Sequence, residues 1–383
     1  MARLLKKFFY IIFFTKKVFK KPLKNKFLIF DEIGSELIQK YLPREHTSIL
    51  QCRDESINLY VLFFCILKGK ISRIDYFNEY IRYVNPKVII STIDNNPTFY
   101  ELFKREDQFK ILVASTIRTP VHDSSLFKLT KNGDIKYDKK TVDIVFTLNS
   151  DIGEKFKKFN VKQVISIGSF KSNHYQLIKK KNIELLYISS WANLPIDHQV
   201  TDEVNFKEFD SHQELLIKNL SKFGNKKNIK ITVLGKMRIL RSDIDKEYNY
   251  FNSILKNNHW EFLKGSEVNS YHIVDRSNIS ITLNSTLGYE SFSRGNKTIF
   301  FDLRSYKKSL EPLKFAWPNV NIRDNGVFWT TDSSYQTLEN IISDVNNIDT
   351  RDWTELSKNY KNILPRDEGN SIFKDKINSL FNL

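Results

Sequence analysis

Residues 279–301 read ISITLNSTLGYESFSRGNKTIFF, and this stretch predicts a strand, a polar turn, a helix and a second strand. Apolar and small polar residues alternate over residues 279–283, as on a strand. Asn284, Ser285 and Thr286 favour a helix start, because their side-chain oxygens can satisfy free backbone N–H groups. Gly295 ends the helix. A strand, helix and strand in succession indicate a parallel α/β sheet.

The same alternation of strands and helices runs through the 383-residue chain. Strands are predicted at residues 26–30, 47–52, 87–91, 110–114, 143–147 and 164–167, then at 183–189, 229–234, 260–263, 279–283 and 298–301. The fold class is therefore α/β, with two Rossmann-like parallel-sheet domains facing a central cleft. We expect a basic arm (residues 1–25), an N-terminal domain (26–180) and a C-terminal domain (181–383). The last helix could pack back on the N-terminal domain.

Composition excludes a disordered or fibrous chain, since 41% of the residues are hydrophobic and there are only 12 Gly and 9 Pro. Cys52 and Cys65 fall in segments that we expect to be a buried strand and a buried helix (residues 57–67), which indicates reduced core thiols and a cytoplasmic protein. No metal site is predicted, because Asp243 and Asp245 fall in a predicted polar loop rather than after an apolar strand.

The first 30 residues contain no acidic side chain, although the formal net charge of the chain is +16. Nine basic residues surround the apolar run at residues 8–14, which is too short to span a bilayer. A helix lying in the membrane interface accounts for both features. We therefore expect peripheral contact with an anionic membrane through residues 1–25. The alternative is a solvated basic helix docked on the domain.

The turn at residues 284–286 is also a candidate anion site. The N–H groups and the dipole at a helix N-terminus attract phosphate. Glu290 lies one turn into this helix, where its carboxylate could accept hydrogen bonds from sugar hydroxyls. The alternative is an ordinary N-cap with a favourable acidic residue near it.

Residues 285–290 and 293–297, with the strand after them, resemble a segment of GT-B glycosyltransferase-like proteins of bacterial capsule and O-antigen biosynthesis. The resemblance implies that Ser285, Thr286 and Glu290 contact a nucleotide-sugar donor, and that Gly288 allows close approach. It also implies that the Ser293 to Lys297 exit segment lines the donor site. The co-substrate is then a nucleotide sugar, with no cofactor and no metal.

Residues that follow the carboxyl ends of other strands are further candidates for contact with the donor. Gly235 and Lys236 follow the strand at residues 229–234, where a lysine could neutralise phosphate. Ser189 and Ser190 end the first strand of the C-terminal domain. For Gly235 and Lys236 the alternative is a solvated basic loop. For the second segment the alternative is that Trp191, which follows Ser190, packs between the domains.

Sugar transfer with inversion needs a base for the acceptor hydroxyl. Asp31 and Glu32 follow the first strand and rank first, Asp94 follows the third strand and ranks second, and His122 with Asp123 is a weaker possibility. Turn formation and helix capping are alternative roles for the three leading carboxylates.

These features predict a glycosyltransferase that moves a sugar from a nucleotide-sugar donor to a lipid-linked or growing surface glycan. We expect it at the inner face of the cytoplasmic membrane. The alternatives are a nucleotide-sugar epimerase, a polyol-phosphate transferase, or a non-catalytic basic protein that binds membranes or nucleic acid. Nucleic acid is not expected as a partner, because the densest basic cluster precedes the fold.

Overall fold

The computed structural model describes residues 15–53, 55–70, 72–94, 96–114, 142–157, 161–317 and 322–381. The described residues form two compact units. The first unit holds the described residues up to Lys171 together with the C-terminal segment from Asn370, and the second holds Ser172–Gly369. Most of the basic arm (residues 1–14) and the candidate pair His122 and Asp123 lie outside the described residues.

The first unit contains a six-stranded parallel sheet in the order β3-β2-β5-β6-β7-β8. Its strands are β2 (Phe27–Phe30), β3 (Thr47–Leu50), β5 (Val88–Ser91), β6 (Phe109–Val113), β7 (Val142–Thr147) and β8 (Val161–Ser166). Four of these strands, β2, β5, β6 and β7, are almost wholly buried, as continuous apolar runs in a parallel sheet should be. The strand order reverses between β2 and β5, which are neighbours.

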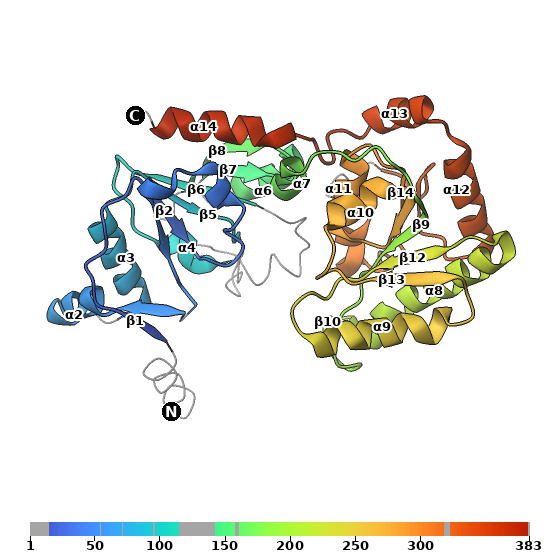
Figure 1. The fold of residues 1–383 in the computed structure, drawn as a ribbon, viewed down its shortest axis with the longest axis horizontal. Helices are drawn as coiled ribbons and strands as arrows, with labels where there is room; N and C mark the ends of the chain where they lie inside the picture. Colours follow the sequence, from blue (N-terminus) through green and yellow to red (C-terminus); the bar gives the residue numbers. More distant parts are fainter. Residues whose placement is uncertain are drawn as a thin grey trace. The chain divides into compact units, whose positions relative to one another are not determined.

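Helices α2 (Leu59–Leu67), α3 (Arg73–Val84), α4 (Pro97–Glu101), α6 (Ser150–Phe156) and α7 (Phe170–His174) belong wholly or partly to this unit. The last helix, α14 (Ser371–Phe381), lies along the sheet near β7 and β8 (Figure 1). Its Phe373, Ile377 and Leu380 are buried in the same apolar core as the strands. The C-terminal helix is therefore part of the first unit's core.

The second half of the basic arm is not helical. Lys16–Val18 forms strand β1, which pairs in parallel with β4 (Ser56–Asn58). The expectation of one membrane-interface helix over residues 1–25 is therefore wrong for this part. Backbone pairing with β4 makes residues 16–18 a folded part of the first unit.

The second unit contains another six-stranded parallel sheet, in the order β13-β12-β9-β14-β15-β16. Its strands are β9 (Ile183–Ile188), β12 (Ile231–Leu234), β13 (Trp260–Leu263), β14 (Ser277–Thr282), β15 (Thr298–Phe301) and β16 (Trp329–Thr330). The strand order reverses between β9 and β14. Both halves of the chain thus have the predicted parallel α/β architecture.

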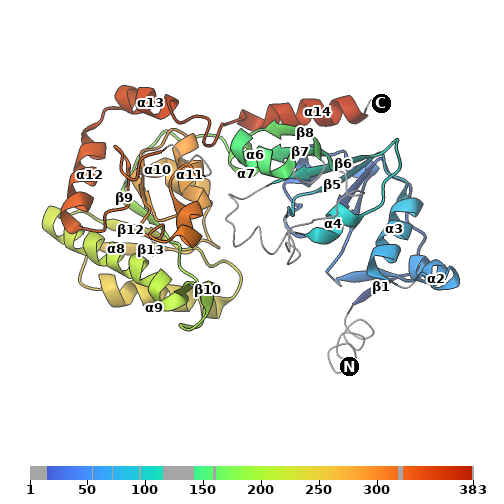
Figure 2. The same ribbon diagram turned by 180° about the vertical axis from the view of Figure 1, so that it is seen from behind.

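Helices α8 (Phe206–Lys227) and α9 (Arg241–Leu255) lie on the opposite side of this sheet from α10 (Ser270–Arg276) and α11 (Thr286–Ser293) (Figure 2). Helices α12 (Tyr335–Asn347) and α13 (Thr350–Lys358) follow β16. Asp243 and Asp245 lie in the first turns of α9, so the predicted polar loop around them is wrong.

The stretch at residues 279–301 has the predicted order of elements, β14, α11 and β15. Ser285 is the N-cap of α11. Gly288 faces Thr282, and a Cβ at Gly288 would come within 2.4 Å of the Thr282 methyl carbon. The glycine therefore lets the helix pack closely on its own preceding strand. Within the described residues, no helix combines the length and apolar character needed to cross a bilayer.

Candidate functional site

The carboxyl edge of the second sheet brings several predicted residues together. Ser189 and Ser190 follow β9, and residues 284–286 follow its neighbour β14. Gly235 and Lys236 follow β12, which pairs with β9 on the other side. The strand order reverses between β9 and β14, and ligands of open α/β sheets bind outside the carboxyl ends of strands at such a point. The candidate site lies here.

The N-terminus of α11 opens onto this edge. The Ser285 Oγ accepts a hydrogen bond from the Leu287 N–H at 3.3 Å, so the hydroxyl caps the helix. Asn284, Ser285 and Thr286 are all half-buried, which leaves them within reach of a ligand. The helix dipole adds partial positive charge to this turn.

Glu247 of α9 organises the neighbouring turn after β12. Its wholly buried carboxylate accepts hydrogen bonds from the Ser189 hydroxyl at 2.5 Å, the Lys236 N–H at 2.8 Å and the Met237 N–H at 2.9 Å. The Ser189 hydroxyl is therefore engaged within the protein, which argues against its predicted contact with donor phosphate. A Cβ at Gly235 would come within 2.5 Å of the Phe262 ring, so this glycine permits close packing.

Ser190 differs from Ser189. Its backbone N–H donates to the Gln213 side chain at 3.2 Å. Its Oγ is buried and forms no hydrogen bond within the described residues. A buried hydroxyl without a partner costs free energy unless a ligand or water supplies one. Ser190 therefore remains a candidate ligand-binding residue.

Sequence reasoning missed Arg304, which lies three residues beyond the end of β15 and is buried at this edge. Its guanidinium donates to the Phe209 carbonyl at 3.0 Å and to the Asn284 Oδ1 at 3.3 Å, and it stacks over the Phe209 ring. An ion pair at 3.6 Å joins it to Asp210. The position of a basic residue just after an apolar strand was the signal that could have identified it.

Lys236 and Arg304 bring two cations to this edge, beside the carboxylates of Glu247 and Asp210. Desolvation and the nearby Arg304 charge lower the pKa of Lys236. Two cations that raise each other's energy favour an anion between or beside them. With the α11 N-terminus, they can offset the charge of a phosphate group.

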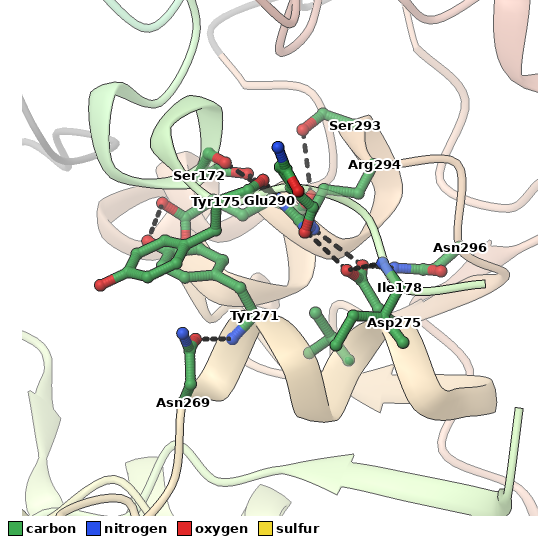
Figure 3. Close-up of polar contacts among 12 residues, drawn as sticks. Ser172, Tyr175, Ile178, Asn269, Tyr271, Asp275, Glu290, Ser293, Arg294 and Asn296 are labelled. Carbon is green, nitrogen blue, oxygen red and sulfur yellow. Dashed lines mark hydrogen bonds and ion pairs between the residues drawn. The ribbon is translucent and has the colours of Figure 1, made fainter. Parts of the chain in front are cut away.

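Glu290 is buried one turn inside α11. Its Oε1 accepts a hydrogen bond from the Tyr271 hydroxyl at 3.2 Å, and the Tyr271 ring stacks on Tyr175 with centroids 5.1 Å apart (Figure 3). Tyr175 belongs to the segment that leads into β9. The carboxylate of Glu290 is thus oriented by an aromatic pair that the sequence did not indicate.

The exit segment after α11 does not line this site. Arg294 forms a buried ion pair with Asp275, and its guanidinium also donates to the carbonyls of Ser172, Tyr175 and Gln176 (Figure 3). Residues 294–297 precede β15, so they lie at the amino edge of the parallel strands. The expectation that residues 293–297 line the donor site is therefore wrong for residues 294–297.

The carboxyl edge of the first sheet carries the predicted bases. Residues 31–32 follow β2 and residues 92–94 follow its neighbour β5. The Thr92 hydroxyl donates to the Gly34 carbonyl at 3.2 Å, so the two loops are in contact. The structure therefore brings all three candidate carboxylates to one edge, at the point where the strand order reverses.

The three carboxylates differ in how far they are buried. Asp31 is wholly buried, pairs with Arg53 at 2.8 Å, and accepts the Ile33 N–H. Asp94 is also buried, at 3% exposure. Glu32 is half-exposed and accepts a hydrogen bond from Gln51. The contacts of Asp31 indicate a structural role, and Glu32 is the candidate base that an acceptor hydroxyl can reach.

Asp302 follows β15 and is also buried. Its Oδ2 accepts the Phe315 N–H at 2.7 Å, while its Oδ1 forms no hydrogen bond within the described part of the chain. Burial raises the pKa of Asp302 to about 8. Its unfolded value is about 4, so between these pH values only the folded state keeps the proton. Folding stability should fall as pH rises through this window.

We expect Asp302→Asn to be more stable than the wild type by about 2 kcal/mol at pH 8.5, since the amide oxygen can accept the Phe315 N–H without a charge. Near pH 4 the two proteins should be equally stable. Urea unfolding at both pH values measures the difference, with the exposed Asp197→Asn as control. Equal stability of wild type and variant at both pH values would contradict the assignment.

No group of three or more His, Cys, Asp and Glu side chains in the described ranges is arranged to hold a metal ion. The site described above combines two cations, a helix N-terminus and an unpartnered hydroxyl with the carboxylates of Glu247, Asp210 and Glu290. This combination is suited to binding a phosphorylated, hydroxyl-bearing ligand.

Residues 111–380 match a protein family described as "putative O-antigen biosynthesis protein". The chain belongs to this O-antigen family. The match contains the whole stretch at residues 279–301 and every predicted donor residue. None of the curated protein sequences matches this O-antigen family member.

Two of the solved structures that match this chain each cover 94% of it. The Anabaena protein HepE, solved with UDP and glucose, is 13% identical, with 94% of this chain and 100% of HepE covered and a TM-score of 0.52. A Listeria monocytogenes protein described as a "putative UDP-N-acetylglucosamine 2-epimerase" is 11% identical, with 94% of this chain and 96% of that protein covered and a TM-score of 0.55. At these identities the likeness shows the fold, which is GT-B-like.

Proposed function

We propose that this member of the O-antigen family is a glycosyltransferase that moves a sugar from a nucleotide-sugar donor to a lipid-linked or growing surface glycan. The observation that carries the proposal is the convergence of Arg304, Lys236 and the N-terminus of α11 where the second sheet reverses its strand order. Family membership and the complexes of HepE with UDP and glucose point to the same substrate class.

In this mechanism the second unit binds the donor. Lys236, Arg304 and the first turn of α11 offset the charge of the diphosphate as it leaves, which lowers the barrier electrostatically. Glu290, oriented by Tyr271, accepts hydrogen bonds from hydroxyl groups of the donor. Glu32 of the first unit takes the proton of the acceptor hydroxyl. The donor is a co-substrate, and the mechanism assigns no step to a metal or cofactor.

A thermal-shift screen of UDP, GDP, CMP and dTDP sugars tests donor binding. We expect one nucleotide class to raise the melting temperature of the wild type, and this rise to be lost in Glu290→Ala and reduced in Ser285→Ala. Ser334→Ala, which removes the N-cap of α12, is the control for loss of a cap alone. Salt-sensitive oligonucleotide binding with no nucleotide-sugar response would contradict the proposal.

The fold of this chain is similar to that of the Listeria monocytogenes protein, and this makes a nucleotide-sugar epimerase the second candidate. The two activities differ in their need for an acceptor. An epimerase converts the donor sugar to its epimer without one, while a transferase releases the nucleotide only when an acceptor is present. Chromatography of the nucleotide sugar after incubation with and without acceptor therefore separates them. A polyol-phosphate transferase would instead respond to a nucleotide-activated polyol such as CDP-glycerol.

We also propose that the basic arm holds the enzyme at the inner face of the cytoplasmic membrane. Residues 1–14 contain three basic residues, five Phe or Tyr residues, and no acidic residue. Such a segment binds anionic head groups and the acyl boundary together. Deletion of residues 1–14, which leaves β1 intact, should weaken binding to anionic liposomes without changing donor binding. Unchanged liposome binding would contradict this role.

A further inference from the structure

Helix α2 exposes an apolar face to solvent. Phe63, Ile66 and Leu67 are spaced i, i+3 and i+4, so they lie on one side of the helix. Their exposed fractions are 56%, 57% and 65%, while Val61 and Cys65 on the other side are buried. The expectation that the helix at residues 57–67 is buried therefore holds for only one of its faces.

Two more exposed apolar residues lie in the segment that follows β1. Phe19 is 73% exposed and Leu23 is 76% exposed. The Asn58 Nδ2 donates to the Lys20 carbonyl at 2.9 Å, and Asn58 is the N-cap of α2. This bond fixes the segment to the start of α2.

Further contacts connect the same elements. The Lys21 ammonium lies over the Tyr83 ring of α3, and that ring packs against Tyr60 of α2 with centroids 5.3 Å apart. Strand β1 and helix α2 lie side by side in both views of the fold (Figures 1 and 2). We call the five residues Phe19, Leu23, Phe63, Ile66 and Leu67 the α2 surface.

Basic residues accompany the α2 surface. The segment from β1 to β2 contains Lys16, Lys17, Lys20, Lys21, Lys24 and Lys26, and residues 15–30 include no acidic side chain. On the neighbouring helices, Glu79 is paired with both Lys68 at 2.5 Å and Arg82 at 3.1 Å. Its negative charge is therefore balanced. The surface combines exposed Phe, Ile and Leu with a net positive charge.

We infer that the α2 surface inserts into the head-group region of an anionic lipid bilayer. Apolar side chains flanked by lysines bind such a membrane, because the side chains leave water while the ammonium groups attract the lipid phosphates. The continuity of this surface with the arm argues for lipid as the occupant, since residues 1–14 run directly into β1. The inference assigns membrane contact to the folded first unit and does not depend on the proposed sugar transfer.

Co-sedimentation of the full chain with vesicles of phosphatidylcholine and phosphatidylglycerol tests this assignment. We expect Phe63→Ser/Ile66→Ser/Leu67→Ser to bind about tenfold more weakly than the wild type, since three apolar side chains no longer leave water. The control Ile239→Ser/Leu240→Ser removes two exposed apolar residues of the second unit and should bind like the wild type. Vesicles of phosphatidylcholine alone should bind the wild type weakly.

A direct contact measurement complements the binding assay. All five tryptophans of the chain lie between Trp191 and Trp353, in the second unit. Phe63→Trp therefore places the first indole in the first unit, and brominated lipid should quench its fluorescence beyond the quenching of the wild type. No added quenching, or unchanged binding of the triple variant, would overturn the inference. Oligomers of the wild type that dissociate in the triple variant, with equal vesicle binding, would instead identify the surface as a contact between copies.

Discussion

Replacing Arg294 by methionine should lower the free energy of unfolding of the second unit by about 3–5 kcal/mol, because the Asp275 carboxylate is then left buried without its ion pair. The Arg294 and Asp275 side chains are 0% and 1% exposed and meet at 2.5 Å. Burial disfavours the charged carboxylate, but hydrogen bonds from Arg294 and Asn296 hold the pKa of Asp275 below its ordinary value. Urea unfolding followed by tryptophan fluorescence reports this unit.

Two further variants separate the ion pair from general damage. Arg351→Met, on the exposed side of α13, should change stability by less than about 0.5 kcal/mol. The double variant Asp275→Asn/Arg294→Met should recover part of the loss, since it removes the unpaired charge. If Arg294→Met is as stable as Arg351→Met, the buried ion pair between Arg294 and Asp275 contributes nothing to folding.

Replacing Glu32 by glutamine should reduce kcat for sugar transfer by about 100-fold or more, because the amide cannot take the acceptor's proton. The fold should be unaffected, since the amide oxygen can still accept the hydrogen bond from Gln51. Donor binding should also be unaffected, because the predicted donor ligands are on the second unit. The measurement is the rate of nucleotide release with the donor that the thermal-shift screen identifies.

The exposed Glu36→Gln is the matched control, since it removes a nearby carboxylate with the same change of side chain. It should keep the wild-type rate. A normal rate in Glu32→Gln together with a large loss in Asp94→Asn would assign the base to Asp94 instead. The pH dependence of kcat/KM adds a second readout, since loss of the base should remove the acidic limb of the profile.

The sequence by itself predicted the two parallel sheets and the position of the α11 turn. Short apolar runs, polar turns and helix caps are local signals, and each depends only on neighbouring residues. Residues 279–301 contain all of them, including Ser285 as the N-cap and Gly295 after the helix. Placement of Glu32, Ser190 and Lys236 at carboxyl edges followed from the same pattern, since parallel strands end at one edge.

Only the tertiary structure decided which of these side chains can contact a ligand. Asp31 and Ser189 directly follow their strands, and Glu32 and Ser190 come one residue later, so sequence position hardly distinguishes them. Arg53 and Glu247, which engage them, come from other elements, so burial and pairing over long separations are invisible to local patterns. Arg294 shows the same limit, because its partner Asp275 is on a different helix.

Helix α2 is a second case, because tertiary packing determined which of its apolar residues are exposed. An apolar helical segment in a sequence indicates a buried helix. How many of its faces are covered depends on which elements pack beside it in the fold. Only one face of α2 packs against α3 and β4, and Phe63, Ile66 and Leu67 remain in water. Sequence determined the elements and their order, and the three-dimensional arrangement determined which polar and apolar groups remain able to meet a ligand.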